Sequence, residues 1–306
     1  MIRPPCDRVQ PRCSLSAGWA ASLLCRAGLS RAWFFLNLAG IACGLLPAFP
    51  LNARAAEGPP VAAMVEPAVE PGPYEERSVR VGEGKEAVEF RYRLLRPATV
   101  VPGMRYPLVL FLHGAGERGD DNVSQLKYLP TWMAEPAMRK RHPCFVVAPQ
   151  CRKDGKWVDI DWSDEKSTPQ KEKPTTDLAA AIAALDAAVR DDAVDRDRIY
   201  LTGLSMGGYG TWDLAARMPE RFAAILPICG GGDEATAEKI ARLPTWCFHG
   251  DTDTAVPVER SRGMIKALRA AGGFPKYSEL KGVGHHSWTT AYRDPAVIDW
   301  LFAQKK

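Results

Sequence analysis

Apolar residues gather in short, nearly continuous runs from residue 107 onward, with polar or helical stretches between them. Runs of this kind are typical of strands buried on both faces of a parallel sheet. Helical spacing of apolar residues fills two of the intervals, at 176–190 and 258–270, with Thr175 or Thr176 as the N-cap of the first. Strands that alternate with helices predict an α/β fold with a doubly wound, mostly parallel sheet. The predicted strands of this sheet cover residues 107–114, 144–150, 198–205, 222–230, 245–251 and 276–282.

A different pattern precedes these runs. Residues 78–82 and 87–95 alternate between apolar and polar positions, and the turn sequence GEGK lies between them, which predicts an antiparallel hairpin. The interval between the strands at 222–230 and 245–251 is too short for a large cap over the sheet. We therefore predict one domain over residues 74–306, preceded by a flexible lead-in at 56–73 that is rich in Pro, Ala, Glu and Val.

Residues 1–55 have the layout of a secretory signal peptide. Arg31 precedes an apolar segment from about Ala32 to Leu51, and Ala53-Arg54-Ala55 forms a small-x-small cleavage site. Asn37 and Pro47 interrupt the apolar segment and disfavour a stable membrane span. Cys43 follows Gly-Ile-Ala, a poor context for lipid attachment, so a lipoprotein is not expected. The sequence thus predicts export to the periplasm or the outside of the cell.

Removal of such a leader changes the charge balance. Residues 1–55 hold six Lys and Arg and one Asp, which leaves 34 basic and 35 acidic residues afterwards. The isoelectric point of 8.6 therefore belongs mostly to the leader. We expect no nucleic-acid partner on this ground.

Four cysteines follow the leader: Cys144, Cys151, Cys229 and Cys247. They are too few for a disulfide scaffold in about 250 residues. Two alternatives stay open, a disulfide between Cys229 and Cys247 in successive predicted strands or buried free thiols. No CxxC pair or His/Cys cluster indicates a metal, so neither a metal nor a cofactor is expected.

Ser205 lies in the sequence GLSMG, a G-x-S-x-G pattern between a predicted strand and a predicted helix. A sharp strand-to-helix turn of this kind exposes the serine hydroxyl, and small neighbours relieve the crowding around it. The following helix N-terminus places N–H dipoles near developing negative charge. The alternative is a tight turn whose serine only caps the helix.

A nucleophilic serine needs a base, and the base needs an orienting acid, in the chain order Ser, Asp or Glu, His. Asp251 and Asp253 follow the predicted strand at 245–251, at the sheet edge where such folds build their sites. His285 and His286 follow the last predicted strand. We favour Asp253, because Asp251 directly follows the turn glycine. We favour His285, because Gly284 leaves room for its ring.

The oxyanion that develops during acyl transfer needs hydrogen-bond donors. The backbone N–H of Met206, directly after the serine, is one candidate, and that of Ala115, after the strand at 107–114, is the second. Gly116 in the same loop is a possible substrate-binding residue. His113 and His249 are interpreted as structural residues at strand ends, and His142 as a surface histidine.

The segments at 111–122, 197–215, 219–233, 249–257 and 282–288 together resemble the α/β-hydrolase superfamily. The similarity is to its phospholipase/carboxylesterase and dienelactone-hydrolase-like branch, which includes secreted proteins labelled as predicted peptidases or esterases. It covers about residues 107–302. The resemblance implies Ser205 as nucleophile, Asp253 as orienting acid, His285 as base, and Ala115 with Met206 as oxyanion donors. The sequence departs from the pattern at His286, where relatives commonly have a small or acidic residue.

The predicted function is a serine hydrolase that cleaves carboxylic esters. The absence of an amphipathic lid favours small soluble esters, or acyl groups such as acetyl or feruloyl on an exported polysaccharide. One alternative is a serine peptidase of the prolyl-oligopeptidase-like type, which the absence of a gating domain in the N-terminal segment disfavours. Another is a non-catalytic binding protein on the same fold.

Residues 153–174 form a long polar stretch that contains Trp157 and Trp162. Two alternatives stay open: most long polar loops are simply solvated, but indole rings are costly to expose to water, which places both tryptophans at the rim of a pocket. There they would stack on a sugar or an aromatic acid.

Overall fold

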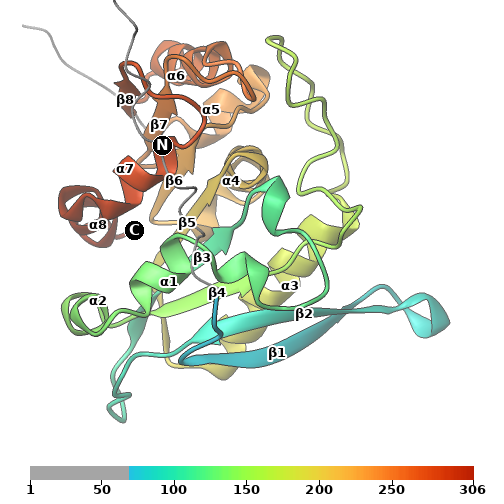
Figure 1. Cartoon of the computed structure of the whole chain (residues 1–306), viewed down its shortest axis with the longest axis vertical. Coiled ribbons are helices and arrows are strands. Elements are labelled where there is room, and N and C mark those ends of the chain that lie inside the picture. Colours follow the sequence, from blue (N-terminus) through green and yellow to red (C-terminus); the bar gives the residue numbers. More distant parts are fainter. Residues whose placement is uncertain (1–68) are drawn as a thin grey trace, which may run out of the picture. The chain divides into compact units, whose positions relative to one another are not determined.

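The computed structural model describes residues 69–306. Its centre is an eight-stranded sheet in the order β1-β2-β4-β3-β5-β6-β7-β8 (Figure 1). The strands are β1 (Tyr74–Val81), β2 (Val88–Leu95), β3 (Tyr106–Leu112), β4 (Phe145–Pro149), β5 (Val194–Leu204), β6 (Ala224–Ile228), β7 (Trp246–Gly250) and β8 (Lys276–Leu280). All the strands predicted from the apolar runs are present.

The direction of the strands divides the sheet into two parts. β1 pairs antiparallel with β2, and β2 pairs antiparallel with β4, whereas every pairing from β4 through β8 is parallel. The predicted N-terminal hairpin is therefore confirmed. β1 begins at Tyr74, earlier than the predicted start at 78, because Tyr74 is buried opposite Leu95 and its hydroxyl donates to the carbonyl oxygen of Pro130.

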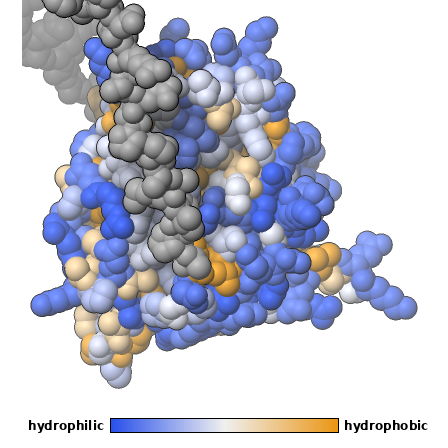
Figure 2. Space-filling view, in the orientation of Figure 1, coloured by the Kyte–Doolittle hydropathy of each residue, from blue (hydrophilic) through white to orange (hydrophobic). Residues whose placement is uncertain are grey.

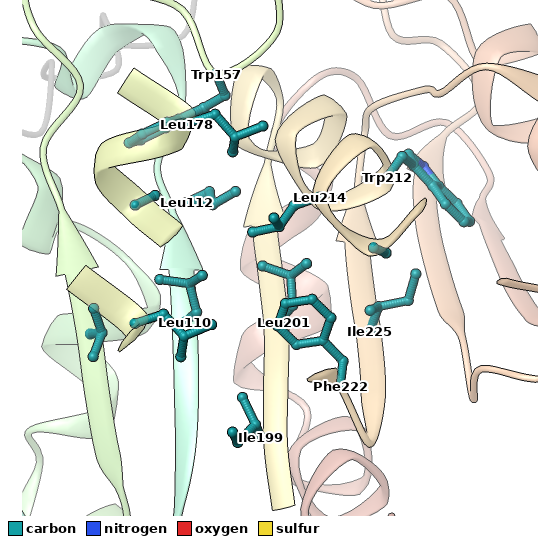
Figure 3. Packing of buried hydrophobic residues seen from close by; sticks show 14 of the residues in the cluster. Leu110, Leu112, Trp157, Leu178, Ile199, Leu201, Trp212, Leu214, Phe222 and Ile225 are labelled. Atoms are coloured by element: carbon teal, nitrogen blue, oxygen red, sulfur yellow. The ribbon is translucent and has the colours of Figure 1, made fainter. Parts of the chain in front are cut away.

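Helices cover both faces of the sheet. Side chains of β3 alternate between two hydrophobic clusters, as the period of two along a strand requires. Leu108, Leu110 and Leu112 belong to one cluster, and Val109 and Phe111 to the other. The first cluster, shown in Figure 3, also contains residues of α3 (Thr176–Asp191), α4 (Met206–Arg217), α5 (Ala237–Ile240) and α6 (Glu259–Ala270). The second contains residues of α1 (Leu129–Met133), α7 (Ser287–Arg293) and α8 (Pro295–Phe302), and Met138 of α2 (Pro136–Arg141) packs against it.

The helices predicted over 176–190 and 258–270 are confirmed as α3 and α6, and the helix predicted directly after Ser205 is confirmed as α4. Thr175, not Thr176, is the N-cap of α3, because its side chain accepts the N–H of Leu178. The sequence did not predict α1, α2, α5, α7 or α8. Each of these helices has four to eight residues, too few turns for a clear period.

The segment between β6 and β7 holds a single 3₁₀ turn, Glu234–Thr236, and the four-residue helix α5. The prediction of a fold without a large cap is therefore confirmed for the described residues. The face of the molecule in Figure 2 is mostly hydrophilic. None of the helices in residues 69–306 is long and apolar enough to cross a bilayer.

Two predictions about the N-terminus lie outside the described residues: the signal peptide at 1–55 and most of the lead-in at 56–73. The described cysteines settle the choice left open by the sequence. Cys144, Cys151, Cys229 and Cys247 are all buried and free, so the disulfide between Cys229 and Cys247 is not formed.

Candidate active site

Ser205 occupies a strained turn between β5 and α4. Its φ of 54° and ψ of −119° lie in a region that side-chain-bearing residues rarely adopt. The backbone on both sides is held, because the N–H of Ser205 donates to the carbonyl oxygen of Ile228 at 3.0 Å and its own carbonyl accepts the N–H of Tyr209 at 3.1 Å. The turn therefore has one defined position relative to the sheet.

The glycines around Ser205 allow the backbone of α4 to approach the sheet closely. A Cβ atom at Gly207 would lie 1.9 Å from the carbonyl oxygen of Leu112 in β3, and one at Gly203 would lie 2.3 Å from the carbonyl oxygen of Gly207. No heavy atom fits at such distances. The glycines in the GLSMG pattern are thus required by backbone packing.

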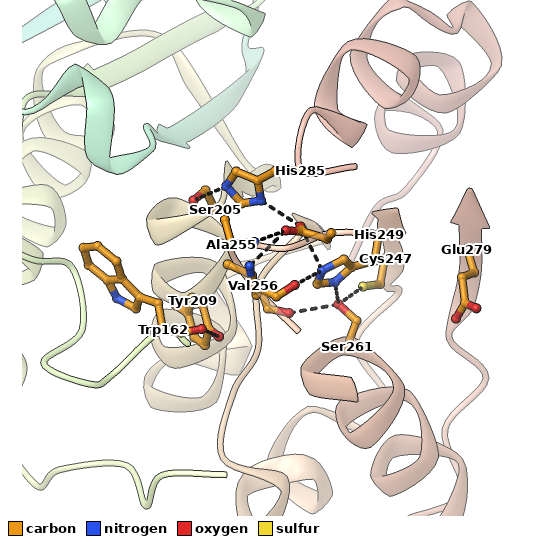
Figure 4. Close-up of polar contacts among 12 residues, drawn as sticks. Trp162, Ser205, Tyr209, Cys247, His249, Ala255, Val256, Ser261, Glu279 and His285 are labelled. Carbon is orange, nitrogen blue, oxygen red and sulfur yellow. Dashed lines mark hydrogen bonds and ion pairs between the residues drawn. The ribbon is translucent and has the colours of Figure 1, made fainter. Parts of the chain in front are cut away.

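His285, in the loop between β8 and α7, faces Ser205. Its Nε2 lies 2.9 Å from Ser205 Oγ, and its Nδ1 lies 2.7 Å from Asp253 Oδ2 (Figure 4). Because a carboxylate can only accept, Nδ1 carries the proton and Nε2 is free to accept the serine hydroxyl. The structure therefore brings together the three residues that the sequence singled out, in the order hydroxyl, imidazole, carboxylate.

Asp253, in the loop between β7 and α6, has a fully buried side chain. Its Oδ1 accepts the backbone N–H groups of Ala255 and Val256, both at 2.9 Å, and its Oδ2 contacts His285 and His249. Burial raises the pKa of this carboxyl, but hydrogen bonds from His249, His285 and the Val256 N–H outweigh burial and hold the pKa below its ordinary value. Asp253 is thus a carboxylate under ordinary conditions.

The two alternatives next to these residues lie elsewhere. Asp251 accepts the N–H of Gly282 at 2.6 Å, so it ties its loop to the turn after β8. His286 is exposed and packs against Trp288, with 4.8 Å between ring centroids. Neither side chain has a hydrogen bond to Ser205 or His285 among the described residues.

Met206 and Ala115 each begin a helical segment. Met206 is the first residue of α4, and Ala115 is the first residue of the 3₁₀ turn Ala115–Glu117. N–H groups at such positions have no acceptor within their own helix. Both are suitable donors for an oxyanion.

The other histidines differ in part from their interpretation. His113 is buried, and its Nε2 accepts the N–H of Cys151 at 2.9 Å, as expected of a structural residue. Burial lowers the pKa of His113 to about 4. The interpretation of His142 as a surface histidine is wrong, because its ring stacks on Phe302 and is hydrogen-bonded to Asp299.

His249 has a contact that the sequence interpretation missed. The sequence predicts only strand-end packing for His249, but its Nε2 lies 3.2 Å from Asp253 Oδ2. The four-residue spacing between His249 and Asp253 was the available signal, because it spans a single tight turn.

The two tryptophans of the 153–174 stretch have different environments. The stacking role predicted for Trp157 is wrong, because Trp157 is 1% exposed and its indole N–H donates to the carbonyl oxygen of His113. Trp162 is partly exposed, and its ring lies 5.9 Å from the guanidinium of Arg118 and 5.5 Å from the Lys156 ammonium. Gly116 is exposed, with open space around it.

One group of potential metal ligands occurs in residues 69–306. The ligand atoms of Cys229, Asp253 and His285 lie within 4.8 Å of one another. Asp253 and His285 are already hydrogen-bonded to each other, and burial raises the pKa of the Cys229 thiol, which opposes the thiolate form that a metal binds. We assign no metal role to this group.

The sheet topology and the strand-to-helix turn at Ser205 define an α/β hydrolase. A model of the phospholipase/carboxylesterase family matches residues 103–296. This match covers more than half of the chain, and the protein belongs to that family.

Three similar proteins illustrate this membership. A solved thermostable esterase is 41% identical, with a TM-score of 0.68 over 76% of this chain and 63% of that chain. A bifunctional acetylxylan esterase/xylanase of Neocallimastix patriciarum is 28% identical over 108 residues, which are 35% of this chain and 16% of that protein. A probable feruloyl esterase C of Aspergillus oryzae is 27% identical over 185 residues, 59% of this chain and 61% of that protein. The chain thus spans less than two thirds of the length of each.

Proposed function

We propose that this protein is a serine esterase that hydrolyses carboxylic esters through an acyl-enzyme intermediate. The observation that carries the proposal is the hydrogen-bonded series from Ser205 Oγ through His285 to Asp253, with distances of 2.9 and 2.7 Å. A serine hydroxyl is a poor nucleophile at neutral pH unless a base takes its proton. The series supplies that base and the acid that orients it.

In the first half of the reaction, Ser205 Oγ attacks the carbonyl carbon of the ester while His285 Nε2 takes the hydroxyl proton. The tetrahedral intermediate collapses, the bond to the alcohol oxygen breaks, and His285 returns the proton to the departing alcohol. Asp253 accepts the Nδ1–H of His285 throughout, which favours the imidazolium over the neutral ring.

The negative charge of the tetrahedral intermediate falls on the former carbonyl oxygen. We assign its stabilisation to the backbone N–H groups of Ala115, which follows β3, and Met206, which follows β5. Two fixed donors of this kind act on charge that appears only in the transition state, so they accelerate the reaction instead of tightening substrate binding.

In the second half, His285 takes a proton from water, and the resulting hydroxide attacks the acyl carbon. Collapse of the second intermediate breaks the bond to Ser205 Oγ and returns the proton to it. Free acid and the original enzyme result, with no cofactor involved.

The direct test is Ser205→Ala. We expect hydrolysis of p-nitrophenyl acetate to fall by roughly three orders of magnitude or more with the fold unchanged by circular dichroism. The wild-type protein should be labelled covalently by a fluorophosphonate and the variant should not. Ser78→Ala, at an exposed serine of β1, is the matched control. Retained turnover or labelling in Ser205→Ala would contradict the proposal.

For the substrate class, we propose small soluble esters or acyl groups carried by a polysaccharide. The names of the fungal relatives and the partial exposure of Trp162 support this class. Trp162→Ala should raise KM for acetylated xylan more than for p-nitrophenyl acetate, because only the polymer has a sugar ring to stack on the indole. An equal effect on both substrates would remove Trp162 from the substrate site.

We further propose that the protein acts outside the cytoplasm, which rests on the signal peptide predicted for residues 1–55. N-terminal sequencing of the protein recovered from the host's exported fraction should begin at Ala56. Recovery of the full chain from the cytoplasm alone would contradict it.

A further inference from the structure

His249 is a second histidine in contact with the carboxylate of Asp253. It is the fourth residue of β7 and is fully buried. Its Nε2 lies 3.2 Å from Asp253 Oδ2 and 3.0 Å from the carbonyl oxygen of Val256, and its Nδ1 lies 2.7 Å from Ser261 Oγ in α6 (Figure 4). Each ring nitrogen therefore has a partner.

The partners of His249 decide which nitrogen carries the proton. The Val256 carbonyl and the Asp253 carboxylate are both acceptors, so Nε2 carries a proton and shares it between them. Nδ1 faces the hydroxyl of Ser261, which also lies 2.9 Å from the carbonyl oxygen of Gly230. The ring is thereby held at both ends.

Asp253 Oδ2 is shared by two imidazoles that come from different parts of the fold. His285 and Asp253 both lie in loops, whereas His249 lies within β7, between β6 and β8 in the sheet. A donor on a strand has a more precise position than one on a loop. His249 is therefore the contact through which the sheet itself restricts the carboxylate.

We propose that His249 is a positioning residue of the candidate site: its Nε2–H holds Asp253 Oδ2 in the orientation that accepts the Nδ1–H of His285. The inference deepens the proposed function and rests on it for its kinetic consequence. The contact itself exists without substrate and is tested separately.

A purely structural role for His249 predicts a different outcome. If the ring only fills space between β7 and α6, its replacement lowers stability but leaves the hydrogen bond between Asp253 and His285 intact. If the ring positions Asp253, its loss weakens that hydrogen bond even in the folded protein. The exchange rate of the His285 Nδ1 proton with water distinguishes the two.

The experiment uses NMR of the folded protein labelled with ¹⁵N in histidine, with four proteins: wild type, His249→Leu, His249→Gln and His142→Gln. The wild type should show protected imidazole protons on His249 Nε2 and His285 Nδ1. In His249→Leu the His285 proton should exchange at least about tenfold faster, because its acceptor is no longer held. His249→Gln keeps a side-chain N–H donor and should restore most of the protection.

His142→Gln removes a histidine far from Asp253 in the sequence and in the hydrogen-bond network, and should leave the His285 proton unchanged. Unchanged protection of that proton in folded His249→Leu would overturn the inference. If His249→Leu does not fold, His249→Phe provides the same test, because its ring occupies a similar space but has no N–H to donate to Asp253. Faster exchange in His249→Phe is expected, and unchanged exchange overturns the inference.

Kinetics supply the second readout. Normalised to sites labelled by a fluorophosphonate, kcat of His249→Leu should fall about 10- to 100-fold, with KM within about twofold of the wild type. An unchanged kcat per labelled site would overturn the positioning role. If the wild type itself neither hydrolyses esters nor reacts with the fluorophosphonate, the proposed function fails, while the NMR result still decides whether His249 holds Asp253.

Discussion

Two segments that meet at α4 are held in place by different means. One is the turn around Ser205, residues 203–210, here called the elbow. The other is the polar stretch at residues 153–174, here called the strap, which connects β4 to α3. The elbow is held by backbone packed directly on backbone, with no room for a Cβ atom at Gly207.

The strap is held by long side chains that reach its backbone. Arg260, buried in α6, donates to the carbonyl oxygens of Asp164 and Lys166. Tyr209 of α4 donates to the carbonyl oxygen of Trp162 at 3.1 Å, and other donors bind further along the strap. These are Arg217 on the carbonyl oxygens of Lys171 and Glu172, and Gln170 of the strap itself on Asp213.

The difference matches what each segment has to do in the proposed reaction. Backbone contacts leave almost no freedom, which suits a nucleophile that must meet the same imidazole in every turnover. Residues that hold the strap by their side chains can be substituted one at a time. The strap, which carries Trp162, can therefore change without moving Ser205. Substitutions that act on one segment but not the other test this distinction.

The largest effect is expected from Gly207→Ala. In a helix this change normally stabilises by about 1 kcal/mol, but here the added Cβ would lie 1.9 Å from the carbonyl oxygen of Leu112. We expect the free energy of unfolding to fall by about 3 kcal/mol or more, and esterase activity to be lost. The loss in the free energy of unfolding is measured by denaturant unfolding. The control is Gly116→Ala, where the added Cβ atom meets nothing within 4 Å. A Gly207→Ala protein as stable as Gly116→Ala would break the comparison.

An intermediate effect is expected from the titration of His113, whose carbonyl oxygen lies beside Gly207 of the elbow and Trp157 of the strap. Its carbonyl oxygen accepts the indole N–H of Trp157 in the strap, and burial lowers the pKa of its ring to about 4. The unfolded chain takes up this proton near pH 6.5, so stability is full above that pH and falls as the pH drops from 6.5 to 4. The loss amounts to about 3 kcal/mol at most.

Thermal unfolding between pH 4 and 7 measures the His113 contribution. His113→Gln should be less stable at pH 7 and should lose less stability on acidification than the wild type. His286→Gln, at an exposed histidine, should keep the wild-type slope. Equal slopes for His113→Gln and the wild type would contradict the assignment.

The smallest effect is expected from Tyr209→Phe, which removes one tether of the strap. One hydrogen bond is worth about 1 kcal/mol, so the loss of stability should be near that value. Because Trp162 is freed and Ser205 is not, KM for bulky esters should rise while kcat for p-nitrophenyl acetate stays unchanged. Tyr277→Phe, which removes a hydroxyl that donates to Glu279, is the control. A fall in kcat for the small ester would show that the strap also positions the nucleophile.

The strands and the longer helices α3, α4 and α6 were predictable because their apolar periods are set by local geometry. The same holds for Ser205, since the glycines on either side of it mark a place where backbone packs closely on backbone. The short helices α1, α2, α5, α7 and α8 were not, because four to eight residues carry little periodic signal. The prediction that Trp157 lies at a pocket rim was wrong for another reason. A segment that is polar on average can still bury one of its indole rings in the hydrophobic core.

The sequence by itself determined the fold class, the turn at Ser205 and the order in which an acid and a base follow it. These are properties of neighbouring residues, where backbone sterics and hydrophobic periodicity act over a few positions. The sequence favoured Asp253 over Asp251 and His285 over His286, but only the tertiary structure brings Asp253, His285 and Ser205 into hydrogen-bonding contact and places His249 against Asp253. These contacts form between side chains from separate loops at one edge of the sheet. The periodicity of neighbouring residues does not predict contacts between segments that are distant in the sequence.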